Sequence, residues 1–91
     1  MKLSEGYLLK EIADSYVLLP VGQQVVDHKN IMQMNDTGFF IASLLQQEIS
    51  YEELLQQMIV EYEANKEEEA ILKKDLDNFL VQLKNRQLII E

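Results

Sequence analysis

Few residues of this 91-residue chain have the types and spacing that chemistry requires. His28 is the only histidine, whereas a metal site needs several converging ligands and a catalytic triad needs an oriented partner. Asp75 and Asp77 stand two apart, so on a helix their side chains diverge and cannot act as an acid–base pair. The chain has no cysteine, and its three glycines are isolated rather than grouped in a phosphate-binding loop. We therefore expect no enzyme, no metal and no cofactor.

The charge distribution argues against a nucleic-acid partner. The net charge is −8, and no third of the chain is net basic: residues 1–34 carry three basic and four acidic residues, residues 35–60 none and four, and residues 61–91 five and eight. The chain therefore has few surplus cations to neutralise phosphates, which is the main source of nucleic-acid affinity. Half of the positive charge lies late in the chain, at Lys73, Lys74, Lys84 and Arg86. These residues indicate either a solvated helix face or a helix that meets an acidic partner.

The composition is that of one globular domain covering residues 1–91. A hydrophobic fraction of 47% and a charged fraction of 26% are ordinary, and two halves of this chain would each be too small to bury a useful core. No stretch approaches the roughly 20 apolar residues that cross a bilayer. Residues 1–14 carry charges where a signal peptide needs an apolar segment. We expect a cytoplasmic protein without a membrane partner.

The elements that must position any site are strands first and helices afterwards. Residues 7–12 and 15–21 are rich in Tyr, Val, Leu and Ile, with a turn between them, and Pro20 marks a strand end or an edge. Residues 31–34 predict a third short strand, whose Met32 and Met34 are expected to lie mostly in the core.

Three helices follow, each with a recognisable start. Asn35 or Asp36 begins a helix that extends to about residue 47. Ser50 and Glu53 form a capping box for a second helix. Asn65 begins a third helix that ends at about Lys84. Its apolar residues follow spacings of three and four and are Leu72, Leu76, Phe79, Leu80 and Leu83.

This order predicts an α+β fold in which a three-stranded antiparallel sheet is followed by three helices, arranged like a winged helix-turn-helix. One sheet face packs on the helices. The outer strands keep unpaired N–H and C=O groups, which must be blocked, covered or used.

The order and spacing of these motifs resemble those of the PqqD family, the peptide-recognition elements of ribosomal-peptide-modifying systems. The matching residues are Met34, Asn35, Thr37, Gly38, Ile41, Leu44, Leu45, Ser50, Glu53, Leu54, Tyr62, Asp75, Leu76, Phe79, Leu80 and Leu83. The strand-hairpin opening also suits the family, so the resemblance covers nearly the whole chain. Two departures are Gln87, where the family has glycine, and a longer segment between the second and third strands.

The resemblance implies a non-catalytic adaptor. Family members bind the N-terminal leader of a precursor peptide and present its core to a modifying enzyme, often a radical S-adenosylmethionine protein. The leader adds as a strand to the third strand's free edge, and its apolar side chains enter a cleft against the third helix. On this chain, Met32→Pro is expected to remove one edge donor. The implied peptide-binding residues are Ile31, Met32, Gln33, Met34, Leu72, Lys73, Leu76, Phe79 and Leu80.

Two functions of other classes remain open at this point. A winged-helix DNA-binding regulator needs a basic recognition helix, yet residues 36–47 and 50–62 contain no Lys or Arg. A general interaction module would pair its exposed edge with a second copy and form a homodimer.

Leaders are often acidic and would be repelled by a net charge of −8, so apolar pockets are expected to outweigh charge in binding one.

Overall fold

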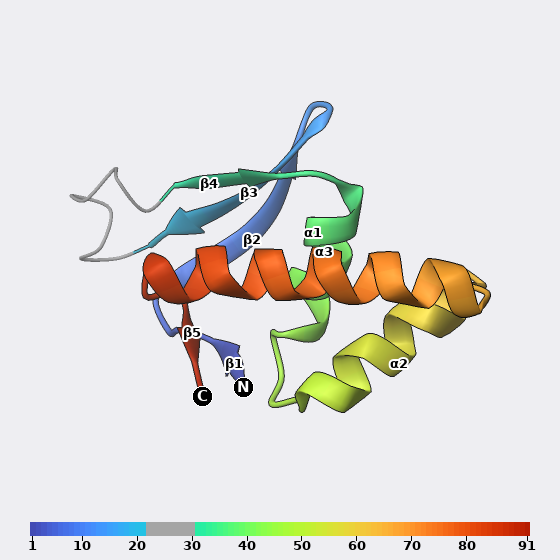
Figure 1. The fold of residues 1–91 in the computed structure, drawn as a ribbon. Helices are drawn as coiled ribbons and strands as arrows, with labels where there is room; N and C mark the ends of the chain where they lie inside the picture. The colour runs from blue at the N-terminus through green and yellow to red at the C-terminus, as the bar shows by residue number, and fades with distance from the viewer. Residues whose placement is uncertain (22–30) are drawn as a thin grey trace.

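The computed structural model describes residues 1–21 and 31–91 of the chain, and His28 lies outside this part (Figure 1). In chain order the elements are β1 (Lys2–Leu3), β2 (Tyr7–Ile12), β3 (Ser15–Pro20), β4 (Met32–Met34), α1 (Asp36–Leu44), α2 (Tyr51–Glu61), α3 (Lys66–Asn85) and β5 (Ile89–Ile90). Strands β2, β3 and β4 form an antiparallel sheet in that order. The predicted fold class, a three-stranded sheet followed by three helices, is confirmed.

A tight hairpin joins β2 to β3. Ile12 pairs with Ser15, which leaves a loop of only Ala13 and Asp14, and Ala13 takes a positive φ of 54°. Two-residue hairpin loops require positive φ values because their twist must match that of the strands. The predicted turn is therefore present, although its first residue is not a glycine.

All three predicted helix starts are confirmed by their capping contacts. The Asn35 side chain accepts a hydrogen bond from the Gly38 N–H at 2.8 Å, which decides between the two caps that the sequence allows. Ser50 and Glu53 form the expected capping box. Asn65 caps α3 in the same reciprocal way with Glu68. Each cap satisfies backbone donors that a helix start leaves without partners.

Helix α1 ends at Leu44, three residues earlier than the sequence predicts. The Leu45 carbonyl accepts a hydrogen bond from the Leu3 N–H at 2.8 Å, and the Ile49 N–H donates to the Met1 carbonyl at 3.0 Å. The Gln46 and Gln47 N–H groups donate to the carbonyls three residues back, and a helix continued past residue 47 would have joined Leu45 to Ile49. The start of the chain therefore takes the hydrogen bonds that would have extended α1.

A two-stranded ribbon of β1 and β5 is a feature that the sequence does not predict. Leu3 pairs with Ile89, and the Ser4 N–H donates to the Leu88 carbonyl at 2.8 Å. Gln87, which stands where the family pattern has glycine, lies just before β5 and has a φ of 58°. That left-handed conformation favours glycine, which explains the family's preference.

One core lies between the sheet, the ribbon and the helices. Its fully buried side chains are Leu18, Ile41, Leu45, Leu54, Met58, Leu76, Leu83 and Leu88. The α3 residues of this core belong to the predicted apolar stripe, whereas Ile71 and Val81 on the same helix are 60% and 54% exposed. Within the described ranges, no helix is both long and apolar enough to cross a membrane.

Candidate functional site

Strand β4 is an edge of the sheet, because in the described part of the chain it pairs only with β3. The hairpin register decides which backbone groups face each side. The short loop makes Ile12 and Ser15 a hydrogen-bonded pair, and such pairs alternate along an antiparallel ladder. Val17 therefore directs its N–H and C=O to β2, whereas Tyr16 and Leu18 direct theirs to β4.

Within the described ranges, Gln33 carries the backbone groups of β4 that no strand pairs with. Met32 and Met34 stand opposite Leu18 and Tyr16 and thus pair with β3. Gln33, between them, must point its N–H and C=O away from β3. The N–H that the sequence assigns to the open edge at Met32 therefore belongs to the ladder, and Met32→Pro would break the sheet instead.

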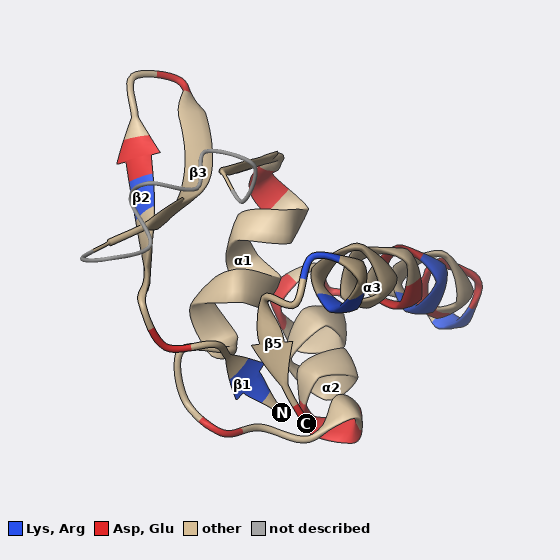
Figure 2. Cartoon of the chain, turned by 90° about the vertical axis from the view of Figure 1, so that its left-hand side faces the viewer, with Lys and Arg blue, Asp and Glu red and all other residues tan. Residues whose placement is uncertain are grey.

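A side-chain contact independently supports the conclusion that the Met32 N–H faces β3. The Arg86 guanidinium donates to the Ile31 carbonyl at 3.3 Å, so that carbonyl points toward α3. The chain has no cis peptide bond in its described part, and across a trans peptide the N–H points opposite to the preceding C=O. The Met32 N–H therefore points away from α3 and toward β3. In Figure 2, α1 lies in the middle, with β2 and β3 on one side of it and α3 on the opposite side.

An apolar-floored cleft of about 200 Å³ lies between this edge and α3. Met32 and Phe79 are only 3% and 8% exposed, and the amide side chains of Gln33 and Gln82 are exposed at its rim. The residues that line it are Met32, Gln33, Met34, Asn35, Phe79 and Gln82. The cleft thus combines free backbone hydrogen-bonding groups with buried apolar side chains, which is what strand addition requires.

Gly38 allows β4, α1 and α3 to meet closely at the end of the cleft. A Cβ atom on Gly38 would lie 3.0 Å from the Met34 Cβ and 3.0 Å from the Phe79 Cε1. Both distances are well below the roughly 3.5–4.0 Å of an ordinary carbon contact. The junction is further fixed by the Asn35 cap and by Tyr16, whose ring stacks on Phe39 with a centroid distance of 4.2 Å.

The charge on the cleft differs between its two ends. Arg86 stands beside Ile31, at the start of β4. At the other end, Asp36 raises the pKa of the Tyr16 hydroxyl mainly through its negative charge. A bound segment would therefore meet a cation at one end and an anion at the other.

The structure brings together five of the nine residues predicted for the site and separates the others. Ile31, Met32, Gln33, Met34 and Phe79 lie at the edge or in the cleft. Leu76 and Leu80 are buried in the core beneath. Leu72 lines a different pocket at the start of α3. Lys73 is exposed and lies about 120° around the helix axis from Phe79, at about 100° per residue.

Sequence reasoning missed Asn35 and Gln82 as lining residues and Arg86 as the neighbour of Ile31. A signal for two of them was available. Gln82 and Arg86 stand three and seven residues after Phe79, spacings that put side chains on one helix face.

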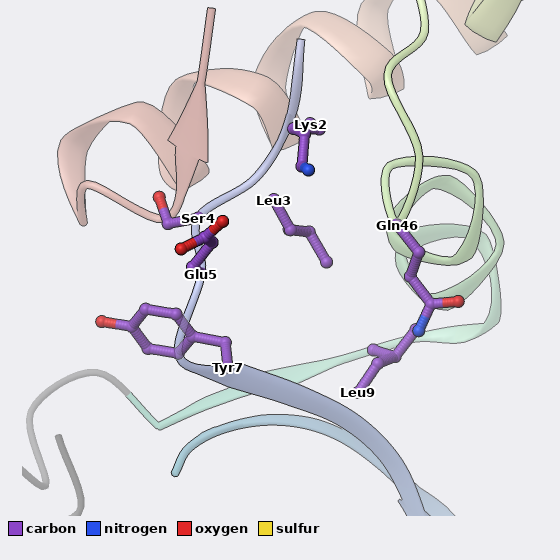
Figure 3. A pocket seen from close by; sticks show the side chains of 7 residues that line it. All are labelled: Lys2, Leu3, Ser4, Glu5, Tyr7, Leu9 and Gln46. Carbon is purple, nitrogen blue, oxygen red and sulfur yellow. The ribbon is translucent and has the colours of Figure 1, made fainter. Parts of the chain in front are cut away.

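A second hollow, of about 240 Å³, opens where β1 leads into β2 (Figure 3). It has no counterpart in the sequence-based prediction. Lys2, Leu3, Ser4, Glu5, Tyr7, Leu9 and Gln46 line it. Lys2 and Glu5 place both charge signs around it, and its floor includes the buried Leu3.

The described residues lack a cluster of potential metal ligands and an unpaired buried polar side chain. No group of three or more His, Asp or Glu side chains gathers there as a metal site would require, and no buried side-chain N or O atom lacks a hydrogen-bond partner. Helices α1 and α2 carry no Lys or Arg, as Figure 2 also shows.

Comparisons with known proteins identify the family of the chain and a structure with a similar fold. The sequence model of a family described as coenzyme PQQ synthesis protein D (PqqD) matches residues 15–89. A solved structure, "TbiB1 in Complex with the TbiA(beta) Leader Peptide", is similar to this chain with a TM-score of 0.71 and 27% sequence identity. The likeness covers 97% of this chain and 93% of that one. A search of curated proteins finds no match.

Proposed function

The chain belongs to the PqqD family, and on that premise we propose that it is a non-catalytic adaptor that binds the leader of a ribosomally made precursor peptide. The similar TbiB1 structure contains a leader peptide, which supports a ligand of the same class for this chain. Both the family and the fold were predicted from the sequence, and both are confirmed.

The observation that carries the proposal is the edge of β4, which no described strand covers, beside a cleft that has an apolar floor and a polar rim. A leader that adds as a strand would accept a hydrogen bond from the Gln33 N–H and donate to the Gln33 and Ile31 carbonyls. Its alternate side chains would point into the cleft, where Phe79 and Met32 form the floor. Backbone pairing then supplies general affinity, and the side-chain pockets supply selectivity.

Arg86 is the intramolecular competitor of such a strand. Its guanidinium occupies the Ile31 carbonyl, and the contact is exposed and long, at 3.3 Å. Hydrogen bonds of this kind are individually weak in water, so a peptide N–H can replace it. The freed guanidinium would then stand beside the bound strand, where an acidic leader residue would pair with it.

The adaptor role implies a second partner, a modifying enzyme such as a radical S-adenosylmethionine protein that receives the bound precursor.

The two alternative functions have less support. A DNA-binding regulator would place a basic helix in the groove, and α1 and α2 contain no basic residue. Homodimer formation would use the same β4 edge, Met32–Met34, that the leader is proposed to pair with. Light scattering separates this case from leader binding, because a dimer has twice the mass without any peptide.

The proposal is tested by titrating the full chain, by isothermal titration calorimetry, with synthetic peptides for each short open reading frame beside its gene. We expect one of them to bind in the micromolar range or tighter. If none of these peptides releases or absorbs heat at several temperatures, leader recognition is contradicted.

A further inference from the structure

An apolar notch of about 130 Å³ lies where α2 is joined to α3. Its lining residues are Tyr62, Ala64, Glu68, Ile71 and Leu72. Tyr62 and Ile71 are 39% and 60% exposed, so the notch leaves large apolar side chains in contact with water. Tyr62 is held in place by an edge-to-face contact with Phe40 of α1, with ring centroids 5.7 Å apart.

The notch and the β4 cleft lie on the same face of α3. At about 100° per residue, Gln82 and Arg86 lie about 60° and 20° from Phe79 on one side. On that same side, Glu68 and Ile71 lie about 20° and 80° from Phe79, and Leu72 lies about 20° away on the other. All these residues fall within an arc of about 100°. Figure 1 shows α3 extending past α1 to the turn where it meets α2.

The two pockets are also close along the helix axis. Leu72 stands seven residues before Phe79, which is a rise of about 10 Å at 1.5 Å per residue. An extended chain covers this distance in about three residues. A peptide that leaves the end of β4 can therefore reach the notch without a long connecting segment.

We propose that the peptide bound at β4 continues along α3 and places one apolar side chain in the notch between α2 and α3. This rests on the proposed function, and it specifies the peptide further: an apolar residue about three positions beyond the segment that packs on Phe79. An apolar cavity of about 150 Å³ holds a benzene ring, so the notch has room for a side chain up to about that size.

The charges beside the notch define the connecting residues. Asp75 lies about 40° from Phe79, between the two pockets on the same face, and is exposed. Glu68 stands at the notch itself, where one carboxylate oxygen accepts from the Asn65 N–H. An acidic residue at this point of the peptide would be repelled. The connecting residues are therefore neutral or basic.

The test compares two substitutions on α3, Ile71→Asp and Val81→Asp. Both residues are exposed apolar positions of the same helix, and both receive the same charge, but Val81 lies about 160° from Phe79. The probe is the precursor peptide identified by the titrations above. Ile71→Asp is expected to raise its Kd about tenfold, because an apolar contact is lost, whereas Val81→Asp changes it less than about twofold.

A peptide variant completes the design. Replacing the notch residue of the peptide by alanine should weaken binding to the natural chain and have almost no further effect on the Ile71→Asp chain. If Ile71→Asp binds like the natural chain while Gln33→Pro binds weakly, the notch plays no part and leader pairing at β4 stands. Equal weakening by Ile71→Asp and Val81→Asp would also overturn the inference, since charge alone would explain it. If Gln33→Pro has no effect either, both proposals fail together.

Discussion

Replacing Gln33 by proline tests the assignment of the free edge most specifically. The Gln33 N–H points away from β3, so proline removes a donor that no strand of the described chain uses. Proline is tolerated on edge strands when its nitrogen faces solvent, and the residue before it is already extended. The free energy of unfolding should therefore change by less than about 1 kcal/mol.

Binding of the leader should respond differently. A net contribution of about 0.5–1.5 kcal/mol for one hydrogen bond corresponds to an increase in Kd of roughly twofold to tenfold. The proline ring also projects toward the incoming strand and adds to the loss. We expect an increase in Kd of about tenfold, measured by isothermal titration calorimetry, with the thermal unfolding midpoint measured on the same samples.

Two controls separate the backbone from the side chain and from the fold. Gln33→Ala keeps the N–H and should bind within about twofold of the natural chain, since Gln33 is exposed. Met32→Pro removes a ladder donor and a buried side chain that is 3% exposed, so it should lower the free energy of unfolding by about 3 kcal/mol or more. Unchanged leader binding by a folded Gln33→Pro chain would refute the reasoning, as would a Gln33→Ala chain that binds equally poorly.

Three other substitutions test the parts that hold the cleft. Gly38→Ala should lower the unfolding midpoint, because overpacking at two 3.0 Å contacts costs about 1–3 kcal/mol against a helix-propensity gain of up to about 1 kcal/mol; a higher midpoint would contradict the close approach. Asn35→Ala should cost about 1 kcal/mol by chemical denaturation, whereas Asn35→Asp keeps the acceptor and should cost much less. Burial, together with the 2.6 Å hydrogen bond to Asp77, raises the pKa of Tyr51 to about 12. Because folding raises this pKa, the protonated Tyr51 contributes its full share to the free energy of unfolding below about pH 10, and this share is lost as the pH rises toward 12. Tyr51→Phe should remove this loss from unfolding curves measured across that pH range.

Local features were predictable from the sequence because they depend on residues that are close together in it. The caps at Ser50 and Asn65 need a partner three residues away, and the apolar stripe of α3 needs only its own periodicity. The junction between β4 and α1 at Asn35 and Gly38 could also be predicted from the sequence, but the close approach of Phe79 to Gly38 could not.

Features that depend on long-range pairing could not be predicted in the same way. The ribbon joins Leu3 to Ile89, and no local pattern encodes that pairing. The direction of the Gln33 N–H depends on the register of a hairpin some twenty residues earlier. Tertiary packing decides which side of α3 faces β4. The sequence alone therefore could not show that Lys73 lies away from the cleft. The polar lining residue Gln82 was missed because an apolar stripe does not mark its neighbours.

The central claim is that the leader completes the sheet at the free edge of β4, and amide hydrogen exchange of Gln33 measures this directly. Exchange followed by NMR, without and with a saturating amount of the leader peptide, reports whether this N–H gains a partner. Its rate should fall strongly on binding, while the rate at Lys10 on the distant strand β2 changes little. A Gln33 amide that exchanges equally fast in the saturated complex would contradict strand addition at this edge.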